Sequence, residues 1–138
     1  MLQRMFSSAH VSLYRWSNGK IGGRFRNGDV LLLTTSGRKS GKKRTTPLIY
    51  VRDGNRLVLI ASNGGSAKDP GWWRNLKHSP LAEVQLKDTR QTIYAERVFG
   101  SERERLWQLM TSTLPFYDGY AKKTKRDIPV VVLRPKLE

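Results

Sequence analysis

A strongly basic turn from Gly37 to Arg44 is the segment of this sequence best suited to hold an anion. Five of the seven residues from 38 to 44 are Arg or Lys, and glycines stand at positions 37 and 41. Glycine lets backbone amides turn toward an anion, and the cationic side chains supply the opposite charge. The segment lacks the spacing and the following helix of a P-loop. It therefore predicts either a phosphate site or a solvated basic hairpin.

A second candidate segment joins the end of an expected strand to the start of an expected helix. Residues 61–68 contain the adjacent glycines 64 and 65, and residues 69–75 contain the pair Trp72-Trp73. Close backbone, a helix N-terminus and indole rings could together hold a flat, anionic, heterocyclic ligand. Neighbouring residues on a helix point in different directions. We therefore expect one tryptophan in the core and the other in the wall of the site.

A third candidate is the segment 116–120, in which Tyr117 and Tyr120 stand three residues apart behind Pro115. Their phenols could donate hydrogen bonds to a carbonyl substrate. The alternative is that both tyrosines pack on the rim of the domain without touching a ligand.

The charge balance indicates an anionic partner. The 138 residues carry 26 basic and 11 acidic side chains, a formal net charge of +15. Such a field attracts nucleic acid, an anionic membrane leaflet or a small ligand rich in phosphate and carboxylate. Nucleic-acid binding is disfavoured, because the aromatic residues do not alternate with basic ones along a strand.

The absence of cysteine and the scarcity of histidine limit the chemistry. Zero cysteines exclude disulfides and thiolate ligands, and fit a reducing, cytoplasmic compartment. His10 and His78 lie far apart, with no metal-binding or triad spacing, so we expect no metal site. If the chain is an enzyme, an organic cofactor is expected to carry the chemistry.

The N-terminal residues 1–16 predict an amphipathic helix. Its expected apolar face consists of Leu2, Met5, Phe6, Ala9, Leu13 and Trp16. The helix either packs on the domain or lies on an anionic membrane surface, and it lacks the features of a signal peptide. We assign residues 1–17 to this helix and residues 18–138 to one globular domain.

The rest of the sequence predicts a mainly β (α+β) fold of about six strands. The expected strands are 29–35, 44–52, 56–62, 82–86, 90–98 and 128–133, with helices opening at an Asp69-Pro70 cap and at a capping box over 101–104. The strands form mostly adjacent hairpins. A small antiparallel barrel with short inserted helices is favoured over an open α+β sandwich, because closure removes exposed edges.

Ordered motifs across residues 18 to 135 resemble the mycobacterial-type deazaflavin-dependent nitroreductase and quinone reductase family. They are Leu33-Thr-Thr-Ser-Gly-Arg-Lys-Ser-Gly41, Arg44-Thr-Thr-Pro-Leu48, Arg52-Asp-Gly54, Ala61-Ser62 with Gly64-Gly65, Trp72 with Asn75-Leu-Lys77, and Ile128-Pro-Val-Val-Val132. The resemblance implies a split, flavin-reductase-like β-barrel. It also implies hydride transfer from the reduced 8-hydroxy-5-deazaflavin coenzyme F420 to a quinone, with nitroaromatic compounds as further acceptors.

The resemblance also implies roles for individual residues. Lys39 and Arg44 should hold the coenzyme phosphate, and Ser62, Tyr117 and Tyr120 should serve the reaction. The implied coenzyme-binding residues are Arg38, Lys39, Arg44, Thr46, Pro47, Ala61, Ser62, Asn63, Lys68, Trp72 and Asn75. Lys42 and Lys43 would be outer contacts to the glutamate tail.

Two positions depart from the best-known family pattern. Leu114 replaces a pocket tyrosine and Asn63 replaces a lysine. These changes bear on the acceptor more than on the coenzyme. An FMN-dependent reductase of the same barrel class remains the alternative enzyme, and a basic nucleic-acid-binding barrel remains the alternative binding protein. Location on the inner face of the plasma membrane depends on the N-terminal helix, and the sequence predicts no oligomeric state.

Overall fold

The computed structural model describes residues 2–136, with side chains from residue 8 onward. The helices are α1 (Leu2–Ser17), α2 (Gly71–His78), α3 (Gly100–Thr113) and α4 (Phe116–Lys123), with a single 3-10 turn η1 (Asn63–Gly65). The strands are β1 (Arg24–Phe25), β2 (Gly28–Ser36), β3 (Lys43–Asp53), β4 (Arg56–Ile60), β5 (Leu81–Leu86), β6 (Thr89–Val98) and β7 (Val130–Pro135). Most bounds lie within two residues of those predicted.

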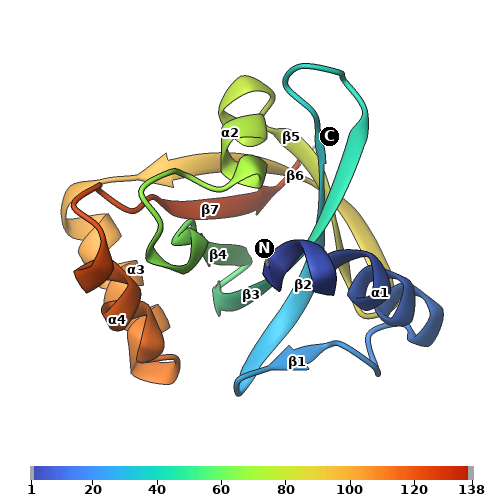
Figure 1. Ribbon diagram of the computed structural model, residues 1–138, viewed down its shortest axis with the longest axis horizontal. Coiled ribbons are helices and arrows are strands. Elements are labelled where there is room, and N and C mark those ends of the chain that lie inside the picture. Colours follow the sequence, from blue (N-terminus) through green and yellow to red (C-terminus); the bar gives the residue numbers. More distant parts are fainter. Residues whose placement is uncertain (1, 137–138) are drawn as a thin grey trace.

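The strands close into an antiparallel barrel (Figure 1). The order is β1-β2-β3-β4-β7-β6-β5, and β2 pairs additionally with β5. Leu33 of β2 lies opposite Thr46 of β3 on one side and Val84 of β5 on the other. Because the barrel is closed, each of the six longer strands pairs with a neighbour on both sides over at least part of its length. The predicted barrel is confirmed, and the open sandwich is excluded.

Strands β2 and β7 are apolar on both faces because both faces are covered. Leu31 and Leu33 point into the barrel, whereas Val30 and Leu32 pack beneath α1. Strand β7 repeats this arrangement, with α3 covering its outer face. Each fully buried aliphatic side chain contributes about 1.5–3 kcal/mol. The continuous apolar runs in the sequence therefore reflect strands between two cores and not one-sided strands.

The face that α1 turns toward the barrel differs from the predicted one. Tyr14 is fully buried, and its hydroxyl donates to the Gln85 carbonyl at 3.3 Å and accepts from the Lys87 amide at 2.8 Å. Leu13 and Trp16 are 45% and 79% exposed, so these two members of the expected apolar face do not pack on the barrel. Tyrosine pairs a large apolar ring with a polar end that reaches backbone groups. The predicted contacts of Leu2, Met5 and Phe6 lie outside the described side chains. No helix within residues 2–136 is both long and apolar enough to cross a bilayer.

Two predicted helix caps are also wrong. Helix α2 begins at Gly71 with Pro70 as its N-cap residue, and Asp69 instead pairs with Arg126 at 2.8 Å. Helix α3 begins at Gly100, so residues 101–104 lie inside the helix and form no capping box. The first residues of α2 and α3 are fixed by partners distant in the sequence and by the path of the backbone. The spacing of neighbouring residues in the sequence does not reveal either.

Candidate functional site

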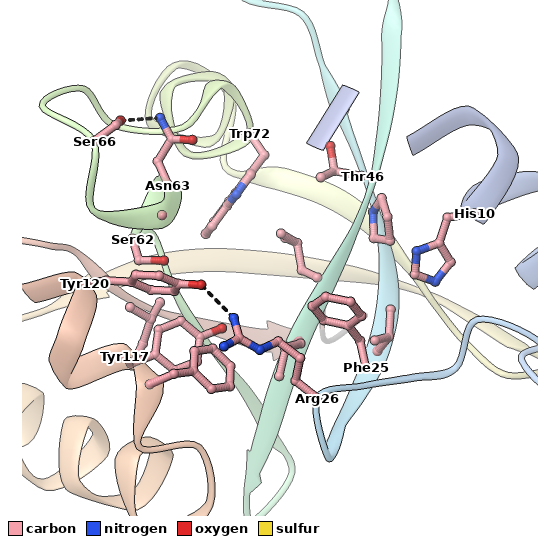
Figure 2. Close-up of a pocket in the computed structure, with 17 residues that line it drawn as sticks. His10, Phe25, Arg26, Thr46, Ser62, Asn63, Ser66, Trp72, Tyr117 and Tyr120 are labelled. Atoms are coloured by element: carbon pink, nitrogen blue, oxygen red, sulfur yellow. Dashed lines mark hydrogen bonds between the residues drawn. The ribbon is translucent and has the colours of Figure 1, made fainter. Parts of the chain in front are cut away.

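A cavity of about 590 Å³ opens between the barrel, α1, α2 and α4 (Figure 2). Its lining combines aromatic, aliphatic and hydroxyl side chains from segments far apart in the sequence. These are His10, Phe25, Arg26, Val30, Thr46, Pro47, Leu48, Ile49, Ile60, Ser62, Asn63, Gly64, Ser66, Trp72, Phe116, Tyr117 and Tyr120. A largely apolar cavity with a few convergent polar groups is typical of a small-molecule or cofactor site.

The cavity unites seven of the predicted site residues, namely Thr46, Pro47, Ser62, Asn63, Trp72, Tyr117 and Tyr120. The other predicted coenzyme contacts, Arg38, Lys39, Arg44, Ala61, Lys68 and Asn75, do not line it. Of the two adjacent tryptophans, Trp72 faces the cavity and Trp73 packs within the core.

Arg126 holds the loop that carries Ser62. Its Nη2 donates to the carbonyl oxygens of Ala61 at 3.1 Å and Ser62 at 2.6 Å. Its Nε donates to the Ser66 carbonyl at 2.9 Å, and its Nη1 to the Asp69 carboxylate at 2.8 Å. The Arg126 side chain is only 15% exposed. One guanidinium therefore fixes both ends of the loop, a role that nothing in the sequence pattern around Arg126 indicates.

The same loop packs closely against α4. Gly65 has φ +82°, and a Cβ there would lie 2.9 Å from the carbonyl oxygen of Tyr120. Asn63, with φ 48°, donates from Nδ2 to the Ser66 hydroxyl at 2.8 Å and to the Lys68 carbonyl at 3.1 Å. Glycine is required where backbone segments approach this closely. The loop and the tyrosines of α4 thus form one continuous wall.

Three aromatic rings of α4 cluster at this wall. Phe116, Tyr117 and Tyr120 have centroid separations between 4.7 and 5.8 Å, in tilted and edge-on arrangements. Tyr117 is 6% exposed, and burial raises its pKa well above the ordinary tyrosine value. Its phenol therefore stays protonated at neutral pH and can act only as a neutral hydrogen-bond donor or acceptor.

Two hydroxyl groups of largely buried residues open onto the cavity without protein partners. Ser62 is 7% exposed, and neither its Oγ nor the Tyr117 hydroxyl hydrogen-bonds to any described residue. A hydroxyl that lacks a protein partner and opens onto a cavity can form a hydrogen bond with a ligand placed there. The arrangement can hold a carbonyl or another oxygen acceptor inside an aromatic enclosure.

Asn75 organises the root of the basic hairpin. Its Oδ1 accepts from the backbone N and the Nη1 of Arg38 at 3.2 and 2.9 Å, and its Nδ2 donates to Thr35 at 3.0 Å. Asn75 is 5% exposed, so its side-chain amide forms its hydrogen bonds within the protein and not with a ligand. Ala61 is fully buried, and Lys68 is exposed on the loop.

Strand β3 connects the basic hairpin to the cavity. Lys39 and Arg44 are both exposed. Arg44 precedes Thr46 by two residues on β3, so the two side chains leave the same face of the strand about 7 Å apart. A ligand that fills the cavity beside Thr46 can therefore extend an anionic tail toward Arg44.

His10, Phe25 and Arg26 also line the cavity and were not predicted from the sequence, whereas Phe116 belongs to the predicted segment 116–120. His10 reaches the cavity from α1, with its Nε2 2.5 Å from the Gly22 carbonyl oxygen. The two-residue strand β1 shows no periodicity, so only the Asn27-Gly28 pair could have signalled a hairpin there. Among the described residues, no group of three or more His, Asp or Glu side chains is placed to hold a metal ion.

Comparisons with known proteins agree on one family. The family model described as F420H(2)-dependent quinone reductase matches residues 6–135. The F420H(2)-dependent quinone reductase Rv1261c of Mycobacterium tuberculosis is 40% identical over 128 residues, which cover 90% of this chain and 86% of the relative.

Solved structures show the same likeness. The structure of an F420-H2 dependent reductase (FDR-A) is 39% identical, with a TM-score of 0.71, covering 79% of this chain and 95% of that one. A structure described as a domain-swapped dimer is 35% identical, with a TM-score of 0.73, covering 91% of this chain and 96% of that one.

Proposed function

The chain belongs to the F420H(2)-dependent quinone reductase family, and from that membership we propose that it transfers a hydride from reduced coenzyme F420 to a quinone. The observation that carries the proposal is the pair of unpartnered hydroxyls of two largely buried residues, Ser62 and Tyr117, in an aromatic-lined cavity. Family membership does not favour the FMN-dependent reductase or the nucleic-acid-binding barrel.

The residues present fit the deazaflavin coenzyme. Trp72 and Pro47 offer flat apolar surface, and Gly64 has open space where a Cβ would stand, which admits a planar ring close to backbone. Thr46, Ser62 and Asn63 offer polar contacts within the same cavity. When bound, the reduced coenzyme supplies a hydride, that is, two electrons and one proton. The other implied contacts, Arg38, Ala61, Lys68 and Asn75, would act from the loop and the hairpin around it.

Lys39 and Arg44 hold the phosphate of the coenzyme tail in this proposal. Both side chains are exposed at the basic hairpin, and Arg44 lies on the strand that enters the cavity. Guanidinium and ammonium groups bind phosphate through charge-assisted hydrogen bonds. Asn75 supports this site from behind, because it anchors Arg38 to the hairpin root.

The hydroxyl groups bind and orient the acceptor. Tyr117 donates from a buried phenol to a quinone oxygen, and Ser62 or Tyr120 meets the oxygen as negative charge develops. The quinone gains the hydride and becomes a hydroquinone anion, and one proton from water completes the hydroquinone. The walls formed by Trp72 and Phe116 exclude bulk water from the reacting faces.

Quinones are the proposed main acceptors and nitroaromatic compounds the secondary ones. Leu114 is fully buried, where its methyl groups pack against Gly28, and it does not line the cavity. This position therefore supplies no phenol to the acceptor. The chain relies on Tyr117 and Tyr120 alone, which suits a carbonyl acceptor with one oxygen to bind at a time.

We also propose that α1 rests on the anionic inner face of the plasma membrane, where lipid-soluble quinones reside. Leu13 and Trp16 are exposed on α1, with Arg15 between them and Ile21 exposed just beyond the helix. Apolar side chains flanked by cations are typical of a helix that lies in a lipid interface. The double variant Leu13→Ser/Trp16→Ser should bind anionic vesicles more weakly. Phe99→Ser, which removes an exposed ring elsewhere, is the matched control.

The main experiment combines binding and turnover. The purified chain is titrated anaerobically with reduced F420 and, separately, with reduced FMN, and is then mixed with menadione or a nitroimidazole. We expect tight F420 binding, weak FMN binding, and reoxidation of the coenzyme that is faster with the quinone. Binding of FMN in preference to F420, or coenzyme binding without quinone reduction, would contradict the proposal.

A further inference from the structure

Arg26 lies at the tip of the hairpin between β1 and β2 and reaches across the cavity (Figure 2). Arg26 and Asn27 have φ values of 51° and 68°, the backbone of a two-residue hairpin turn with both central residues in the left-handed region. The Nη1 of Arg26 donates to the Tyr120 hydroxyl at 2.9 Å, and its guanidinium carbon lies 4.2 Å from the Phe116 ring centroid. The turn therefore aims a cation at the aromatic wall of α4.

The charge of Arg26 is not neutralised by the described residues. Among these residues, no carboxylate lies within 4.0 Å of its guanidinium, whereas the neighbouring Arg24 pairs with Asp29 at 3.0 Å. The partners of Arg26 are a neutral phenol and a ring face, and most of its five N–H donors remain unused. A cation with neutral partners at a cavity remains available to an anionic ligand.

The contact also fixes how Tyr120 can act. Arginine has no acceptor, so the Tyr120 oxygen must accept the proton of Arg26 in their hydrogen bond. The Tyr120 O–H is thereby left to donate elsewhere. Arg26 and Tyr120 thus present two kinds of donor, one charged and one neutral, next to each other in the cavity.

We propose that Arg26 is a specificity-determining residue that selects quinones carrying an anionic ring oxygen, such as hydroxyquinones. This inference rests on the proposed quinone reduction, and it adds the charge class of the acceptor. The guanidinium pairs with the ring oxygen anion, while Tyr120 and Phe116 hold the ring beside it. No covalent step involves Arg26.

Two naphthoquinones of nearly equal shape test this inference. The hydroxyl of 2-hydroxy-1,4-naphthoquinone ionises at neutral pH, whereas 2-methoxy-1,4-naphthoquinone is neutral. Binding of each is measured without coenzyme by quenching of tryptophan fluorescence, since Trp72 lines the cavity. Turnover of each with reduced F420 is measured separately. The variants are Arg26→Gln, Arg26→Lys, and Arg90→Gln as a charge-matched control outside this cavity.

We expect Arg26→Gln to weaken binding of the hydroxy compound by about tenfold, as for loss of one charged hydrogen bond, and that of the methoxy compound less than about twofold. Arg26→Lys should recover part of the difference, and Arg90→Gln should change neither value. Equal weakening of both compounds, no weakening, or absence of binding to the parent chain would overturn the inference. A parent chain that shows the Arg26 effect in binding but does not oxidise reduced F420 would overturn the proposed function instead.

Discussion

Two arginine–aspartate pairs hold segments that contribute residues to the cavity, and they differ chiefly in burial. Arg126 and Asp69 are 2.8 Å apart, with side chains 15% and 24% exposed. Arg24 and Asp29 are 3.0 Å apart, with side chains 67% and 59% exposed. A well-hydrated pair adds little to stability, whereas breaking a desolvated pair leaves a charge without a partner.

This difference separates the two walls of the site. The wall that carries Ser62 is set by folding, because Arg126 also binds three backbone carbonyls of the loop. The opposite wall is an exposed hairpin turn that meets α4 through Arg26. A fixed wall suits a coenzyme of constant shape. An exposed wall can adjust to acceptors that differ in shape and charge.

The largest effect is expected from Arg126→Gln. It should lower the free energy of unfolding by about 3 kcal/mol, the lower end for breaking a buried pair, because the Asp69 carboxylate and the loop carbonyls lose their donor. Chemical denaturation monitored by circular dichroism measures this loss. A change below about 1 kcal/mol would mean that the loop is held by other contacts.

Tyr117→Phe should have the next largest effect, on turnover and not on folding. It removes one buried donor and keeps the ring, so quinone reduction should slow by about 10- to 100-fold while coenzyme affinity stays nearly constant. Tyr120→Phe should do less, because two phenols three residues apart do not reach one oxygen equally well. Unchanged turnover in both variants would remove the tyrosines from the reaction.

The buried phenol also predicts a pH dependence. Burial raises the folded-state pKa of Tyr117 above the ordinary value of 10.0, so its contribution to stability is fully present below that pH. The contribution is lost as pH rises above this value, because the unfolded chain ionises first. Denaturation of the parent and of Tyr117→Phe between pH 8 and 11 should show a shallower alkaline decline for the variant.

Lys39→Ala and Arg44→Ala should each weaken coenzyme binding by about tenfold, near the lower limit for a charged hydrogen bond, because both side chains are exposed. The loss should shrink as salt is added, since screening weakens both parent and variant attraction. Lys136→Ala, which removes an exposed lysine elsewhere, is the control. Binding equal to the parent in both hairpin variants would contradict the phosphate assignment.

The smallest effect is expected from Arg24→Gln. Its exposed pair with Asp29 should contribute about 0.5 kcal/mol to stability. The same denaturation measurement, made on Arg24→Gln and Arg126→Gln together, decides whether burial accounts for the difference in stability between the two ion pairs. Equal losses in the two variants would contradict the division of the site into a fixed and an adjustable wall.

Much of the barrel could be predicted from the sequence because its strands are short apolar runs between turn signals such as Asp53-Gly54. The inward face of α1 could not be predicted, because Tyr14 is held there by hydrogen bonds to backbone groups of residues 85 and 87. The Asp69 cap failed for the same reason, since its partner Arg126 is 57 residues away.

The parts of the candidate site that lie in sequence motifs could be predicted. The parts that depend on contacts between distant segments could not. Ser62 and Trp72 line the cavity, and both belong to segments whose glycines and aromatic rings predicted a ligand site. Arg26 comes from a hairpin whose first strand has two residues, too short for any periodicity. The role of Arg126 depends on four contacts with a loop about 60 residues earlier in the chain.

Docking of Tyr14 onto the end of β5 has a consequence for the order in which the molecule is assembled. The Tyr14 hydroxyl forms hydrogen bonds with backbone groups that lie 71 and 73 residues later in the chain. Helix α1 therefore cannot complete its packing on the barrel until the second half of the chain is present. Contacts of such sequence separation form late, because loop closure precedes any gain from them. Helix α1 is thus among the last elements to take its final position, although it precedes the barrel strands in the chain. Protection of the Lys87 amide from hydrogen exchange during refolding would time that event.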